Sequence, residues 1–122
     1  MVRRTAEREQ FLADIITGAI EGGINYWAAT EEYKWDCPAQ DTHAVIREVL
    51  DFDAPEYGPP VIMTLDTIAR GIRILLEPGV EISPDIREAV REGNRDNDAC
   101  YIDADAADCI VQMAIFGKLV FG

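Results

Sequence analysis

The sequence is poor in positively charged residues. It has 11 Lys and Arg, one His and 23 Asp and Glu, which gives a formal net charge of −12 over 122 residues. Direct binding to nucleic acid is therefore the least favoured function, because a chain without a basic cluster cannot release counterions from a phosphate backbone. The excess of acid instead attracts basic partners and cations. We expect the partner to be a protein with a basic surface.

Cysteines and long hydrophobic runs are also scarce. The three cysteines, Cys37, Cys100 and Cys109, form no CxxC pair, which favours reduced thiols over a disulfide framework. The charged N-terminus is followed by an amphipathic segment rather than a continuous apolar run, so we expect neither a signal peptide nor a membrane span. These features predict a cytoplasmic protein with no membrane partner.

No motif for catalysis or phosphate binding stands out. The single histidine, His43, has no second histidine or cysteine at ligand spacing, and a catalytic histidine needs a nucleophile and an orienting carboxylate. The aspartates between Asp96 and Asp108 could offer oxygen ligands to calcium, but the EF-hand glycine is absent and helix capping explains them more simply. We predict a protein that is not an enzyme and carries no cofactor or metal.

Apolar residues recur at helical spacing in four segments of what composition indicates is one domain, residues 1–122. With 48% hydrophobic and 28% charged residues, the chain has the balance of a folded protein. The spacing predicts helices over residues 5–21, 65–77, 85–92 and about 103–117. Gly22–Gly23, Gly93–Asn94 and Gly117 are the expected ends of the first, third and fourth helices.

Strand-forming residues predict a small sheet between the first two helices. The expected strands cover residues 24–35, 43–51 and 61–63, with residues 53–60 as an acidic, proline-rich loop and residues 118–121 as a possible edge strand. This order predicts a segregated α+β fold, in which a three-stranded antiparallel sheet carries helices on one face. An exposed edge on so small a sheet makes a homodimer possible.

The segment from Gly22 to Trp27 has the composition of a ligand-binding corner. Tyr26 and Trp27 could stack on a ring while Asn25 forms hydrogen bonds with it. Arg70 and Arg73 lie about one helical turn apart and would add anion recognition if they faced the same corner. This pattern predicts a site for a nucleotide, and the alternative interpretation is a tight turn with aromatic core residues.

Acidic residues gather in three candidate partner-binding patches. Each patch places several carboxylates close together in the sequence, as a surface that occupies a basic groove would need. The patches are Glu31, Glu32 and Asp36; Asp51, Asp53 and Glu56; and Asp96, Asp98, Asp103 and Asp105.

Three blocks of the sequence stand out together: Ala19–Trp27, Thr64–Gly71 and Asp108–Gly117, with a terminal Val-Phe-Gly. In these blocks the chain resembles small uncharacterised proteins of phages and prophages, notably in actinobacterial hosts. The blocks follow one another in the same order over most of the chain, so the resemblance is to a whole protein. It implies an accessory viral protein in the host cytoplasm, with no known activity and no catalytic residues.

Charge and the implied phage context together predict interference with the host. We expect a DNA mimic, whose acidic surface blocks a host defence or nucleic-acid-binding protein. Two alternatives stay open. One is a sponge that sequesters a signalling nucleotide at the corner of Asn25, Tyr26 and Trp27, and the other is a phage structural or regulatory protein that assembles with itself.

Overall fold

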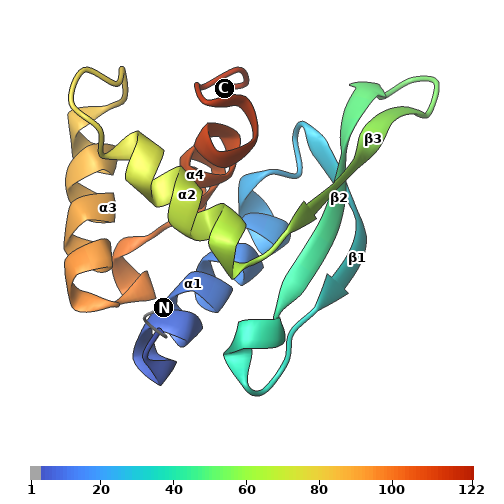
Figure 1. Cartoon of the computed structure of the whole chain (residues 1–122). Helices are drawn as coiled ribbons and strands as arrows, with labels where there is room; N and C mark the ends of the chain where they lie inside the picture. Colours follow the sequence, from blue (N-terminus) through green and yellow to red (C-terminus); the bar gives the residue numbers. More distant parts are fainter. Residues whose placement is uncertain (1–3) are drawn as a thin grey trace.

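Within residues 4–122, one α-helix precedes a three-stranded antiparallel sheet and three α-helices follow it (Figure 1). The computed structural model describes residues 4–122. The predicted α+β fold is confirmed. The elements, with short 3-10 turns at Ala39–Asp41 and Ala99–Tyr101, are α1 (Ala6–Gly18), a π-helical turn (Ala19–Gly23), β1 (Ala28–Lys34), β2 (His43–Asp51), β3 (Glu56–Met63), α2 (Leu65–Leu75), α3 (Pro84–Asp96) and α4 (Ala104–Phe116).

The helices bury one face of the sheet. Ala44 and Ile46 of β2 and Met63 of β3 are at most 1% exposed and belong to the same hydrophobic cluster as Phe11 of α1 and Ile110 of α4. Ile62, which alternates with Met63 along β3, is 63% exposed. This alternation is typical of an antiparallel sheet with one solvated face. No helix within residues 4–122 is long and apolar enough to cross a membrane.

The prediction of a loop over residues 53–60 is wrong, because β3 already begins at Glu56. Glu56 pairs with Asp51 and Tyr57 pairs with Val49, so β2 and β3 form a long hairpin with irregular register near its tip. Pro59 and Pro60 are compatible with this strand because β3 is at the edge of the sheet, where a missing N–H is tolerated. The tip of the hairpin extends beyond the helices (Figure 1).

The helix ends confirm one expected glycine and correct two. Gly117 ends α4 with a φ of 74°, as predicted. Gly22–Gly23 is not a left-handed end, because the chain continues from α1 into the π-helical turn. Glycine is needed at position 23 for a different reason: a Cβ there would lie 2.8 Å from the carbonyl oxygen of Ala104. Helix α3 also continues past Gly93 to Asp96, and Asn97 caps it with a φ of 52°.

The possible edge strand over residues 118–121 does not form. The Oε1 atom of Gln112 accepts the backbone N–H groups of Val120 and Phe121 at 2.8 and 2.9 Å, and its Nε2 atom donates to the carbonyl oxygen of Phe121 at 3.2 Å. A side chain of α4 therefore takes the hydrogen bonds that a neighbouring strand would have supplied.

Candidate functional site

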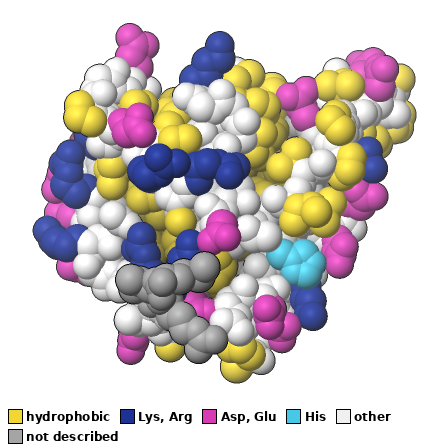
Figure 2. Space-filling view, in the orientation of Figure 1, with side chains coloured by type: hydrophobic (Ala, Val, Ile, Leu, Met, Phe, Trp, Pro, Cys, Tyr) yellow, Lys and Arg dark blue, Asp and Glu magenta, His cyan; other side chains and the backbone are white. Residues whose placement is uncertain are grey.

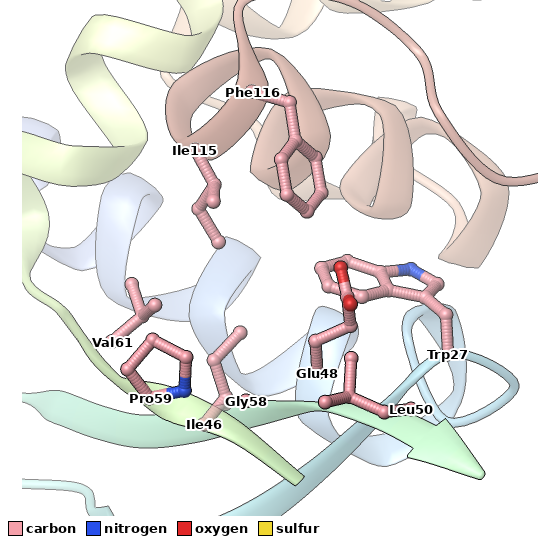
Figure 3. A pocket seen from close by; sticks show the side chains of 9 residues that line it. All are labelled: Trp27, Ile46, Glu48, Leu50, Gly58, Pro59, Val61, Ile115 and Phe116. Atoms are coloured by element: carbon pink, nitrogen blue, oxygen red, sulfur yellow. The ribbon is translucent and has the colours of Figure 1, made fainter.

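A cleft of about 320 Å³ opens between the β2–β3 hairpin and the end of α4 (Figure 3). This volume is at the lower end of the range of ligand-binding sites. Glu48 is the only ionisable side chain among the lining residues, and its carboxylate points into the cleft. The lining residues are Trp27, Ile46, Glu48, Leu50, Gly58, Pro59, Val61, Ile115 and Phe116.

The cleft exists because β2 is longer than the part of the sheet that the helices cover. Ala44, Ile46, Glu48 and Leu50 alternate along β2 and therefore share one face of the sheet. The first two are buried, Glu48 is half-buried and Leu50 is 53% exposed. Figure 2 shows hydrophobic side chains along the hollow between the helical part and the hairpin. The inner face of the hairpin thus becomes the wall of an open apolar site.

Trp27, at the back of the cleft, is fixed by the buried carboxylate of Asp108 in α4. Its Nε1–H donates to Oδ1 of Asp108 at 2.8 Å, and Gln112 Nε2 donates to the same oxygen at 2.9 Å. Tyr26 donates its hydroxyl hydrogen to Oδ2 at 2.5 Å. Three donors from two parts of the chain therefore converge on one carboxyl group and hold the indole in a single orientation.

Aromatic packing fixes the same indole ring from other sides. Phe121 stacks on Trp27 with ring centroids 5.0 Å apart and planes 7° from parallel. Phe116 packs against it at 5.6 Å in a tilted arrangement. Since Gln112 holds the backbone of Phe121, the C-terminal segment and the cleft wall form one connected unit. This wall is preorganised before any ligand arrives.

The environment of Asp108 also changes the acidity of Tyr26. Partial burial, followed by the hydrogen bond to the Asp108 carboxylate, raises the pKa of Tyr26 to about 12. Burial disfavours the charged phenolate, and the Asp108 carboxylate disfavours a second negative charge beside its own. At neutral pH the Tyr26 hydroxyl therefore stays protonated and donates its hydrogen bond, so it is not a candidate base.

The residues of the predicted nucleotide site do not gather in one place in the structure. Asn25 is exposed, while Tyr26 and Trp27 both bind Asp108. Arg70 donates from Nε and Nη2 to the carbonyl oxygen of Ala114, at 3.3 and 3.1 Å, and Arg73 is exposed. Trp27 does line a cleft, but neither arginine lines it with Trp27. The charged group in that cleft is the carboxylate of Glu48, which repels phosphate.

Two carboxylates of the first acidic patch, Glu31 and Asp36, each lie beside a cationic side chain. Glu31 accepts a hydrogen bond from Arg47 Nε at 2.8 Å, and Asp36 lies 3.2 Å from Lys34 Nζ. Glu32 lies 3.6 Å from His43 Nε2. The backbone N–H of Cys37, and then Lys34, lower the pKa of Asp36. This patch offers less free negative charge than its sequence indicates.

The third acidic patch serves mainly local structure. Asp98 accepts from the backbone N–H of Cys100, and Asp103 accepts from that of Ala106 at the start of α4. Asp96 forms two hydrogen bonds with Arg95, which lower the pKa of the carboxyl group. Asp105 lies in the first turn of α4, where an acid complements the helix dipole. These contacts support the capping interpretation. No group of three metal-ligating side chains is present within residues 4–122.

The second patch, at the hairpin tip, keeps its charge available. Asp51 accepts from the backbone N–H groups of Asp53 and Ala54 at 2.9 and 3.2 Å, which shapes the turn. Within residues 4–122, none of Asp51, Asp53 and Glu56 forms an ion pair. Exposed apolar side chains lie among them: Leu50, Phe52 and Tyr57. The tip and the cleft together form an acidic and apolar surface.

Sequence reasoning missed Glu48, Asp108 and Gln112 as members of the site. A signal existed for each of them. Asp108 and Gln112 stand four residues apart within an otherwise apolar stretch of α4, the spacing of side chains that meet on one helix face. Glu48 interrupts an apolar alternation along β2.

The chain matches no protein-family model, no curated protein and no solved structure.

Proposed function

We propose that this chain is a non-enzymatic accessory protein that binds and inhibits a basic, nucleic-acid-binding host protein through its β2–β3 hairpin. The observation that carries the proposal is the hairpin tip, where Asp51, Asp53 and Glu56 are exposed and have no cationic partner within residues 4–122. The net charge of −12 extends this negative field. Such a surface steers basic proteins toward it and competes with DNA for their binding grooves.

The placement of the charges favours the hairpin over the other acidic patches. Carboxylates that already have a cation or a backbone N–H beside them contribute less to the attraction of a partner. This applies to Glu31, Asp36 and Asp96, and at the tip to Asp51 through its two backbone N–H groups. Asp53 and Glu56 are exposed and have no cation beside them within residues 4–122. The tip also presents Phe52, which is 65% exposed. A partner can therefore gain apolar burial as well as charge pairing there.

The nucleotide-sponge alternative receives less support. A nucleotide site needs cations beside the stacking ring, whereas Glu48 stands in the cleft that Trp27 lines and Arg70 is bound to Ala114. Self-assembly through strand pairing is disfavoured at β3, because Pro59 and Pro60 have no N–H to donate. The resemblance to phage proteins supplies the context of a bacterial host.

Reversal of the tip charges tests the proposal. The tagged protein and the variant Asp51→Lys/Asp53→Lys/Glu56→Lys would each be incubated with nuclease-treated actinobacterial lysate, with and without added duplex DNA. We expect the natural chain to recover a basic DNA- or RNA-binding protein that competing DNA displaces. The variant should recover at least tenfold less of it, as quantified by mass spectrometry, and circular dichroism would verify its fold.

A matched variant distinguishes the effect of the tip residues from the effect of the net charge. Glu21, Glu77 and Glu81 are exposed and form no ion pair within residues 4–122, so their replacement by lysine changes the net charge equally. This control should keep the partner, and the purified partner should lose its DNA binding when the natural chain is added. Equal recovery by the tip variant and the natural chain would contradict the proposal.

A further inference from the structure

The chemistry of the cleft beside the hairpin tip indicates how a partner is recognised. Its wall is apolar except for Glu48, and Glu48 forms no ion pair or side-chain hydrogen bond with any residue from 4 to 122. Its side chain is half-buried, so the carboxylate stands at the border of apolar surface and solvent. A cation that enters the cleft would pair with it where little water competes. The wall therefore selects a ligand that is apolar and positively charged.

The charges around the cleft point to the same kind of ligand. Asp51, Asp53 and Glu56 stand on the hairpin whose inner face forms the wall. The nearest cation of β2, Arg47, lies on the opposite face of the sheet from Glu48, because adjacent strand residues alternate, and it binds Glu31 and the carbonyl oxygen of Gly58. No arginine or lysine lines the cleft. Its field is negative, which excludes anionic ligands.

The apolar surface continues beyond the cleft, which indicates a protein segment as the occupant. Leu50, at the mouth of the cleft, is 53% exposed, and Phe52 and Tyr57 extend the exposed apolar surface of the hairpin. A small amine would cover the cleft alone. A segment of a protein could place one side chain in the cleft and cover the hairpin with the next ones. Trp27 is already fixed by Asp108, so little ordering is needed at the back of the cleft.

We propose that the cleft is the docking site for a cationic amphipathic segment of the partner protein, which inserts an apolar side chain between Trp27, Ile115 and Val61 and places a lysine or arginine on Glu48. This inference rests on the proposed function and names the chemistry of the partner. The apolar side chain displaces water from the wall, and the cation neutralises the carboxylate.

The test uses the ¹⁵N-labelled full chain and a synthetic 12-residue amphipathic peptide of Trp, Leu and Arg. A second peptide has every Arg replaced by Glu. We expect the cationic peptide to shift the amide signals of residues 46–50, of Gly58 and Val61, and of residues 115–116, and the acidic peptide to cause no shift. Glu48→Gln should weaken binding about tenfold, whereas Glu77→Gln, an exposed control, should leave it unchanged.

A second variant addresses the apolar part of the site without changing charge. Ile115→Trp fills the cleft from the α4 side, and it should weaken binding of the cationic peptide by a similar factor. Heteronuclear spectra should show that the fold is intact. Shifts spread over other acidic surfaces, or equal affinity of Glu48→Gln and Glu77→Gln, would overturn the inference. So would equal or tighter binding of phenethylammonium alone, or concentration-dependent dimerisation through the same residues.

The outcomes also separate this inference from the proposed function. If Glu48→Gln and Ile115→Trp bind the purified host protein as the natural chain does, while the triple lysine variant of the hairpin tip does not, the docking cleft is refuted and the proposed function stands. If none of these variants loses the host protein, both are refuted.

Discussion

Replacement of Asp108 by alanine should be among the most destabilising changes in this protein. The Asp108 side chain accepts hydrogen bonds from Trp27 Nε1 and Gln112 Nε2, and both of these residues are at most 2% exposed. Every buried polar side-chain atom within residues 4–122 has a partner in the native fold. In Asp108→Ala, the indole N–H would lose its acceptor, and Gln112 Nε2 would keep only its two longer hydrogen bonds, to the Tyr26 hydroxyl oxygen at 3.3 Å and the Phe121 carbonyl oxygen at 3.2 Å.

The expected loss follows from those two donors. A buried donor without an acceptor costs about 2 kcal/mol and the loss of the shortest Gln112 hydrogen bond about 1 kcal/mol, so Asp108→Ala should lower the free energy of unfolding by about 3 kcal/mol. That is a large share of the stability of a small domain, which is about 5–15 kcal/mol. Asp108→Asn should cost about 1 kcal/mol, because its amide oxygen can keep both donors and the Tyr26 hydroxyl can accept from the amide nitrogen.

Urea unfolding followed by tryptophan fluorescence and circular dichroism measures both losses. Tyr26→Phe is the control, since it removes the donor whose residue is 48% exposed, and it should cost no more than about 1 kcal/mol. If the alanine and asparagine variants lose equal stability, or if alanine costs as little as Tyr26→Phe, the carboxylate does not organise this part of the core.

Two further changes probe the packing of α2 against α4 and the high-pH limit of stability. Gly71→Ala should destabilise the fold by about 3 kcal/mol, because the new Cβ would overlap the carbonyl oxygen of Ile110. The control Gly22→Ala should be nearly neutral, because its Cβ would meet only Ala104 Cβ at 3.9 Å. Equal melting temperatures of the two variants would contradict this prediction. Since the pKa of Tyr26 rises from 10 to about 12 on folding, its stabilising effect is full below pH 10 and is lost as pH rises through 12. Tyr26→Phe should flatten that decline, and a tyrosine absorbance titration should lose its step near pH 12; an unchanged titration would show that another tyrosine is responsible.

Local sequence signals predicted most elements because those elements depend on short-range physics. The helical spacing of Ile68, Ile72 and Leu75 gives α2 whatever the rest of the chain does, and Gly117 ends α4 through its own backbone freedom. Residues 56–60 were missed for the opposite reason. Prolines and acids favour a loop in isolation, and only pairing with β2 makes this segment a strand.

The candidate site shows the same division between local and tertiary information. The sequence by itself determined the acidic charge, the helix order and the presence of Trp27 next to a turn. Only the tertiary structure decided that Trp27 turns to Asp108, 81 residues away, that Gln112 rather than a strand holds the C-terminal segment, and that Glu48 stands alone in an apolar cleft. Composition and periodicity act through neighbours in the chain, whereas a partner for a buried polar group or a free charge is set by which distant segments the fold brings together.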